Sequence, residues 1–285
     1  MKANVYAILD EAGSHNRVQT ETQPTQTQPG STDVDGNGLA EAGDAPNQPE
    51  APGFDLFTHP GQYLTRKIRH DTYEYVDPLA AAQNMSGKYV FIASASGVIG
   101  TRTAVAFARA GVSGIALTAR SNEKLDEVEK AVLADAEAKH NTDLKILKVL
   151  MDVSDSESIT RAAEVTRAAF GKLDTIVNLA AQIDAGFISS IDVDEWWRPL
   201  ETNVRGSYLV IRALLPLLGE AKEGEAKVII NSVSFSAHHA FPLSSGYHVS
   251  NNSASSSLVT ALMISPTTPF HVLIVDKQTR ARSDE

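Results

Sequence analysis

The 285-residue sequence has no cysteine, only 6% aromatic residues and no long apolar run. Without cysteine the chain can form neither a disulfide nor a thiolate metal site. No segment reaches the ~18 consecutive apolar residues of a membrane-spanning helix. Acidic residues outnumber basic ones by 35 to 25, and the net charge of −10 argues against nucleic acid or an anionic membrane surface as the main partner. These absences favour a soluble, cytoplasmic protein.

The composition divides the chain into three parts. Residues 1–52 are expected to form a disordered tail, because residues 14–52 are nearly free of aliphatic side chains and rich in Pro, Gln, Thr, Gly and Asp. Residues 53–86 regain aromatic side chains and are expected to pack as a lead-in segment. Residues 87–285 are expected to form the folded domain, since 42% of the chain is hydrophobic and can build a sizeable core.

From residue 87 onward, apolar runs alternate with helical patterns. The predicted strands are 90–93, 114–118, 144–151, 175–179, 227–232 and 270–275. The predicted helices are 99–110, one from Leu125 to near Lys139, one that opens at a Ser154/Glu157 capping box and runs to Phe170, and a long one from Trp196 to Leu215. This alternation predicts an α/β fold, a doubly wound, Rossmann-like parallel sheet in three layers with helices on both faces.

The turn after the first predicted strand is typical of a phosphate site. It reads A-S-A-S-G-V-I-G over residues 93–100, with Gly97 and Gly100 where a helix begins. Backbone N–H groups at a helix start lack intrahelical partners, and glycine lets a diphosphate approach them closely. A glycine pair after a strand is also found in ordinary tight turns, so the elements that follow decide between the two readings.

The turn and the next motifs resemble the short-chain dehydrogenase/reductase family. Gly97 and Gly100 match its glycine motif, while Ser94 stands in place of the first glycine. A serine there is strained if the position has a positive φ. Asp152, in M-D-V-S-D, matches the residue that binds adenine, and Asn178 opens a segment like the N-N-A-G that walls the cofactor.

The resemblance continues into the predicted catalytic residues. Asn203, in E-T-N-V-R-G, matches the active-site asparagine, and Ser234 and Tyr247 lie 13 positions apart, as the family's catalytic serine and tyrosine do. The likeness covers roughly residues 87–250 and fades beyond Ser250, so the chain is expected to be a C-terminally truncated or altered member with an incomplete last part. The resemblance assigns the cofactor to Ser94, Ser96, Gly97, Ile99, Gly100, Arg120, Asp152, Val153, Asn178, Ala180 and Asn251.

The cofactor implied by the resemblance is NADP, with NAD the alternative. Arg120 comes 20 positions after Gly100, where the family reads the adenosine ribose, and neither it nor Ala119 before it is a carboxylate. An arginine there pairs with a 2′-phosphate. An ordinary surface arginine after a strand is the other reading.

In the family, tyrosine donates a proton to a carbonyl, serine holds that carbonyl, and a lysine four residues after the tyrosine lowers the tyrosine pKa. Here Asn251 occupies the lysine position, on the same helix face as Tyr247 but without charge. The resemblance therefore implies an NAD(P)-dependent oxidoreductase of weakened activity, acting on an alcohol or carbonyl compound, with Asn203, Ser234 and Tyr247 as catalytic residues. The alternative is a non-catalytic dinucleotide-binding or interaction protein.

Two further expectations concern other partners. His238 and His239 are adjacent and have no further ligand at a suitable spacing, so no metal site is expected. In the family, the long helix and the helix of Tyr247 pair between subunits, which leaves a homo-oligomer open. No sequence feature names the substrate.

Overall fold

The computed structural model describes residues 77–79, 85–135, 140–219, 227–237, 242–262 and 270–276. The chain divides into two units, Met1–Phe54 and Asp55–Glu285, and every described residue lies in the second. The predicted tail over 1–52 and most of the lead-in segment over 53–86 thus lie outside the described residues. Within the described ranges, no helix is long and apolar enough to cross a membrane.

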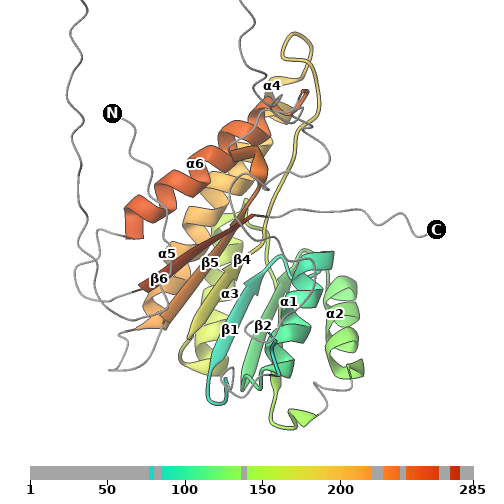
Figure 1. Cartoon of the computed structure of the whole chain (residues 1–285), viewed down its shortest axis with the longest axis vertical. Coiled ribbons are helices and arrows are strands. Elements are labelled where there is room, and N and C mark those ends of the chain that lie inside the picture. Colours follow the sequence, from blue (N-terminus) through green and yellow to red (C-terminus); the bar gives the residue numbers. More distant parts are fainter. Residues whose placement is uncertain are drawn as a thin grey trace, which may run out of the picture. The chain divides into compact units, whose positions relative to one another are not determined.

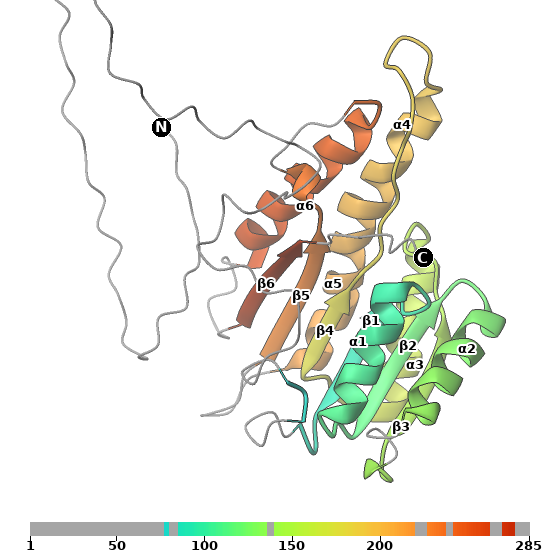
Figure 2. The ribbon, with the colours of Figure 1, turned by 45° about the vertical axis from the view of Figure 1, so that its right-hand side comes forward.

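Six parallel strands form one sheet in the order β3-β2-β1-β4-β5-β6 (Figure 1 and Figure 2). The strands are β1 (Tyr89–Ala93), β2 (Gly114–Ala119), β3 (Lys145–Leu150), β4 (Thr175–Asn178), β5 (Lys227–Val233) and β6 (Phe270–Asp276). All six strand predictions are confirmed to within about one residue at each end. The buried strands β1 and β2 show the continuous runs that are typical of strands covered on both faces, whereas β3 is only partly buried. The strand order reverses between β1 and β4, and ligands of such sheets bind at the carboxyl ends of the strands at this point.

Helices cover both faces of the sheet and complete the predicted three layers (Figure 2). They are α1 (Val98–Arg109), α2 (Asn122–Ala134), α3 (Ser156–Phe170), α4 (Val193–Pro199), α5 (Ser207–Leu218) and α6 (Ser245–Leu262). Alternate residues of β1 serve opposite faces. Phe91 and Ala93 pack with α3 and α5, whereas Val90 and Ile92 pack with α1 and α2.

The predicted long helix from Trp196 to Leu215 is three consecutive pieces. A π-helical segment, η4 (Leu200–Gly206), separates α4 from α5. Pro199 directly precedes it, and proline removes one backbone donor from the regular helical ladder. A Cβ on Gly206 would lie 2.8 Å from the carbonyl oxygen of Val153, so glycine allows this segment to approach the end of β3 closely.

The predicted capping box of α3 is wrong by one residue. Asp155 is the N-cap, and its carboxylate accepts a hydrogen bond of 2.9 Å from the Glu157 N–H. The Ser154 hydroxyl instead donates to Asp152, at 2.6 Å. Serine and aspartate are both good N-caps, so spacing alone did not distinguish the two neighbours.

Helix α2 ends at Ala134, short of the predicted end near Lys139. Asp135 adopts an extended backbone conformation, and its carboxylate accepts two bonds from the Arg109 guanidinium, at 3.0 and 2.6 Å. A bidentate pair of this kind is geometrically specific, and here it joins the end of α2 to the end of α1.

Helix α6 is continuous to Leu262 although its middle is rich in serine and asparagine. These side chains bond to carbonyls of their own helix. Ser250 Oγ and Asn251 Nδ2 each donate to the Tyr247 carbonyl oxygen, both at 2.8 Å, and Ser255 Oγ donates to the Asn252 carbonyl. The side-chain donors thus bond within the helix instead of opening it.

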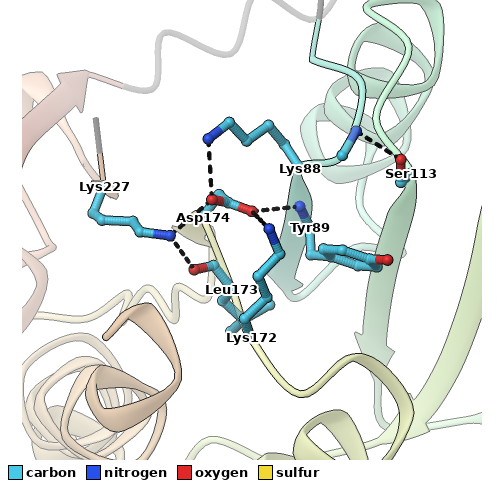
Figure 3. A network of polar contacts seen from close by, with 8 residues as sticks. Lys88, Tyr89, Ser113, Lys172, Leu173, Asp174 and Lys227 are labelled. Carbon is cyan, nitrogen blue, oxygen red and sulfur yellow. Dashed lines mark hydrogen bonds and ion pairs between the residues drawn. The ribbon is translucent and has the colours of Figure 1, made fainter. Parts of the chain in front are cut away.

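A buried carboxylate joins the amino ends of three neighbouring strands (Figure 3). Asp174, directly before β4 and 2% exposed, accepts hydrogen bonds from the Tyr89 N–H at 2.9 Å and from Lys227 Nζ at 2.8 Å. Tyr89 begins β1 and Lys227 begins β5. The ammonium groups of Lys88 and Lys172 lie 3.4 and 3.9 Å from the same carboxylate.

Opposed effects set the pKa of Asp174. Burial, the largest, raises the pKa, while the hydrogen bonds from Lys227 and Tyr89 and the charges of Lys227 and Lys172 lower it and together outweigh burial. The pKa is therefore below its ordinary value. The corresponding stabilisation is present above the unfolded Asp pKa of about 3.9 and is lost as pH falls through the lower folded value.

The substitution Asp174→Asn is expected to lower the free energy of unfolding at pH 7 by about 3–5 kcal/mol, because it leaves the buried Lys227 ammonium without its counter-ion. Denaturant unfolding measures this loss. The matched control is Asp126→Asn, which removes one of two acidic partners of the partly exposed Lys148, with an expected loss below about 1 kcal/mol. Equal losses in the two variants would contradict the prediction.

Candidate dinucleotide and carbonyl site

Ser94 begins the turn after β1 in a left-handed conformation, with φ of 61°. Its N–H donates to Thr118 Oγ1 at 3.3 Å, and the next N–H, of Ala95, donates to the Thr118 carbonyl at 2.8 Å. Both bonds hold the turn to β2, so the surrounding structure maintains the strained residue. This position requires a positive φ, which glycine adopts more easily than any other residue. That is expected if Ser94 replaces the first glycine of the motif.

The two glycines of this turn have different roles. A Cβ on Gly100 would lie 2.5 Å from the Ala95 carbonyl oxygen, so only glycine lets α1 pass this close to the turn. Gly97 is the N-cap of α1, where a Cβ would meet nothing within 4 Å, and no side chain caps the helix. Ser96 and Ile99, on either side of Gly97–Val98, are partly buried. The open helix start fits the diphosphate of a dinucleotide.

Arg120 and Asp152 follow β2 and β3 at the same edge of the sheet. Arg120 is exposed, and its charge contributes to a lowered pKa of Asp152. The main cause of that lowering is the Ser154 hydroxyl, at 2.6 Å from Asp152 Oδ1, followed by the Ser154 N–H at 2.9 Å. Val153, which lies between Asp152 and Ser154 in the sequence, is partly buried against Gly206 of η4. A cation and a carboxylate thus stand together where the resemblance places the adenosine.

Asn178 ties the carboxyl ends of the central strands to a helix. Its buried amide Nδ2 donates to Ser207 Oγ at 2.7 Å and to Asn231 Oδ1 at 2.8 Å, so both N–H groups are used within the protein. Its Oδ1 accepts from the Ala180 N–H at 3.3 Å. The Asn178 side chain therefore acts indirectly: it fixes the position of Ala180, which belongs to the wall of the candidate site.

Asn203 lies in the π-helical segment and is also fully engaged. Its Oδ1 accepts from the Gln182 N–H at 2.8 Å, and its Nδ2 donates to the Gln182 carbonyl at 2.9 Å and to Ser250 Oγ at 2.8 Å. These bonds link η4 to the loop after β4 and to α6. The predicted active-site asparagine thus joins three elements around the site.

Ser234 and Tyr247 come from elements that pack together. Ser234 follows β5. Its hydroxyl donates a hydrogen bond to Ser236 Oγ and accepts one from the Ser236 N–H, both at 3.2 Å. His248 Nδ1 lies 2.9 Å from the Ser236 carbonyl oxygen, and Asn252 Nδ2 donates to the Ala237 carbonyl at 3.1 Å, so two side chains one turn apart hold this segment to α6.

Tyr247 itself is half-buried near the start of α6. Within the described part of the chain, its phenol makes no hydrogen bond, and no direct bond joins it to Ser234. Asn251, four residues on, is 4% exposed and turns its Nδ2 to the Tyr247 carbonyl. The residue in the lysine position therefore bonds within its own helix and brings no charge to the phenol.

A family model described as short chain dehydrogenase matches residues 88–263. The chain belongs to this family. The match includes all the predicted site residues and extends past Ser250, where the likeness read from the motifs ends. The match and the observed parallel sheet confirm the predicted family and the Rossmann-like fold.

Curated short chain dehydrogenases from fungi are similar over most of the domain. The chain is 40% identical over 195 residues to "Short chain dehydrogenase tazN" of Aspergillus terreus, covering 68% of this chain and 41% of that protein. It is 40% identical over 193 residues to "Short chain dehydrogenase pigC" of Monascus ruber, covering 67% and 61%. The chain thus matches about two fifths to three fifths of the length of these relatives.

Solved short chain dehydrogenases share the fold. A short-chain type dehydrogenase/reductase from Mycobacterium marinum has a TM-score of 0.57 and 25% identity, covering 67% of this chain and 74% of that chain. An alcohol dehydrogenase from Thermococcus sibiricus, complexed with 5-hydroxy-NADP, has a TM-score of 0.56 and 22% identity, covering 65% and 74%. At this identity the second comparison establishes the fold alone.

Several residues that organise this short chain dehydrogenase site were missed by motif reading. Asp184 and Gln182 in the loop after β4, and His248 and Ser250 in α6, all bond across elements. Asp184 and His248 bond to backbone atoms of other elements, and Gln182 and Ser250 bond to the Asn203 side chain, so no spacing pattern marks them. His238 and His239 lie outside the described residues. Within the described ranges, no three His, Cys, Asp or Glu side chains are grouped to hold a metal ion.

The substitution Ser94→Gly is expected to raise the free energy of unfolding by about 0–1.5 kcal/mol. It removes a left-handed penalty of about 1–2 kcal/mol and adds a backbone-entropy cost of about 0.5–1 kcal/mol. Denaturant unfolding compares it with Ser94→Ala, which keeps the Cβ and is expected to bring no such gain. A Ser94→Gly protein less stable than wild type would contradict the strain at this residue.

Proposed function

We propose that this chain is an NADPH-preferring oxidoreductase that interconverts a carbonyl compound and its alcohol with low activity. The observation that carries the proposal is the packing of α6 against η4 and the turn after β5, because these elements carry Tyr247, Asn203 and Ser234. The substrate is a small molecule, and the protein acts in the cytoplasm. The domain spans residues 87–285 and follows a tail and a lead-in segment in the sequence. Pairing of α5 and α6 between subunits is part of the same proposal.

The cofactor site supports a dinucleotide lying across the carboxyl edge of the sheet. The open start of α1 at Gly97 receives the diphosphate, while Asp152 binds the adenine and Arg120 pairs with a 2′-phosphate. When bound, the nicotinamide group supplies a hydride. Ser94, Ser96, Ile99 and Val153 line this path, and Ala180, held by Asn178, walls it.

The chain's own residues handle the oxygen of the substrate. In the reducing direction the Ser234 hydroxyl donates a hydrogen bond to the carbonyl oxygen and the Tyr247 phenol gives that oxygen a proton. With a nicotinamide cofactor bound, the carbonyl carbon would take up its hydride, and the product would be an alcohol. A positive charge beside a phenol favours its ionised form, and Asn251 provides none. Proton transfer is therefore the weakened step.

The substitution Asn251→Lys is expected to raise kcat at least about tenfold, because one pKa unit on the phenol corresponds to about 1.36 kcal/mol. NADPH oxidation with a panel of aldehydes and ketones measures the change. Val249→Lys is the matched control, since it places the same charge two residues from Tyr247 on an exposed side of α6 and is expected to change nothing.

Tyr247→Phe in the Asn251→Lys protein should abolish the activity gained. Saturating NADPH should raise the melting temperature of all these proteins by several degrees, because a ligand of the folded state stabilises it by mass action. Dinucleotide binding without turnover in any variant would favour the non-catalytic alternative. The uncharged Asn251 and the strained Ser94 are the two observations that support that alternative. Absence of both binding and turnover would end the proposal.

Arg120→Ala is expected to weaken NADPH binding about tenfold or more and to leave NADH binding nearly unchanged, because only NADPH carries the 2′-phosphate. Titration of each dinucleotide by protein fluorescence gives both dissociation constants. Arg102→Ala, which removes a charge from the exposed side of α1, is the control. An equal loss for both dinucleotides would contradict a role in recognising the phosphate.

A further inference from the structure

A buried carboxylate in the loop after β4 bonds directly to the backbone of Tyr247. Asp184 is 5% exposed, and its Oδ1 accepts from the Tyr247 N–H at 2.7 Å while its Oδ2 accepts from the Gly246 N–H at 3.1 Å. Both N–H groups belong to the first turn of α6, where a helix offers them no acceptor of its own. Asp184 thus caps this helix from an element 62 and 63 positions away in the sequence.

The loop that carries Asp184 is itself fixed on both sides. Before it, the N–H and carbonyl of Gln182 are both bonded to the Asn203 amide, at 2.8 and 2.9 Å. After it, the Gly186 N–H donates to the Leu243 carbonyl at 2.8 Å, just ahead of α6. The position of the carboxylate is therefore set by bonds other than its own bonds to α6, as is required of a residue that positions another.

The first turn of α6 fits closely between Asp184 and α4. A Cβ on Gly246 would lie 2.5 Å from the Trp196 carbonyl oxygen and 3.2 Å from Asp184 Oδ2, so the turn approaches both as only glycine can. The Trp196 indole N–H donates to Ser245 Oγ at 2.9 Å and joins the same turn to α4. Little room remains for the start of the helix to shift.

We propose that Asp184 is a positioning residue that fixes the Tyr247 phenol relative to Ser234. The inference rests on the proposed function, in which Tyr247 gives a proton to the carbonyl that Ser234 holds. The Ser234 turn is joined to α6 through His248 and Asn252, and Asp184 sets where that helix begins. Misplacing a reacting group by about 1 Å can cost about 10²-fold in rate.

The carboxylate is suited to this task in a way that its amide is not. Two N–H donors converge on Asp184, and a carboxylate accepts both, whereas an asparagine has one acceptor oxygen and turns an NH₂ group toward the second donor. Its negative charge also lies at the positive end of the α6 dipole. Asp184→Asn is therefore an informative, nearly isosteric variant.

The experiment compares Asp184→Ala and Asp184→Asn with Asp192→Ala, each in the wild-type and the Asn251→Lys protein. Asp192 accepts from two backbone N–H groups at the start of α4 and is a matched cap that does not touch Tyr247. With NADPH and a ketone, we expect kcat to fall about 10- to 100-fold in Asp184→Ala and less in Asp184→Asn. The NADPH dissociation constant should stay within about twofold, and Asp192→Ala should lower the melting temperature but not kcat.

Two structural measurements decide the proposal without relying on turnover. Hydrogen exchange by NMR should find the Gly246 and Tyr247 amides protected in wild type and in Asp192→Ala, and exposed in Asp184→Ala. Crystal structures should show the Tyr247 phenol displaced relative to Ser234 in Asp184→Ala, or in Asp184→Asn if the alanine variant does not fold. An unmoved phenol, or equal kcat losses in Asp184→Ala and Asp192→Ala, overturns the proposal. Loss of all turnover and NADPH binding in the Asn251→Lys parent would instead refute the proposed function.

Discussion

The carboxylate of Asp174 is the interaction on which the arrangement of the sheet depends. It holds the amino ends of β1, β4 and β5 together from below, through the Tyr89 N–H and the Lys227 ammonium. The opposite ends of the same three strands carry Ser94, Asn178 and Ser234. Because the strands are parallel and paired in a fixed register, a link at one edge constrains the spacing at the other. A structural ion pair at the amino ends of the strands thus supports the candidate site at their carboxyl ends.

At the carboxyl edge the constraint passes from packing to directed hydrogen bonds. Helix α6 is poor in large apolar side chains toward its start, yet separate polar links tie it to its neighbours. Asn203 holds it through Ser250, and His248 holds the turn after β5. Such networks define one geometry well when every member is satisfied, and the described side chains include no buried polar atom without a partner. The geometry of the site is therefore specified even though Asn251 supplies no charge.

Much of this architecture was predictable from the sequence, for definite physical reasons. Strands buried on both faces appear as continuous apolar runs, so β1 and β4 were readable directly, and the spacing between Ser234 and Tyr247 predicts two residues of the candidate site. The π-helical segment was not readable, because an apolar stripe looks the same with or without one wide turn. Asp184 gave no signal either, since its partners are backbone atoms of a distant helix. The N-cap of α3 was misplaced because Ser154 and Asp155 are equally good caps locally.

The wide turn over Leu200–Gly206 also fixes the length of the chain at that place. A π-helical turn holds about one residue more than an α-helical turn and absorbs that residue by widening. Deleting one residue there would let α4 and α5 join as a regular helix with nearly the same faces toward their neighbours. The wide turn itself would be lost, and with it the position from which Asn203 bonds to Gln182 and Ser250. A one-residue deletion in this segment is therefore expected to break the Asn203 links while sparing the contact between Trp196 and Ser245.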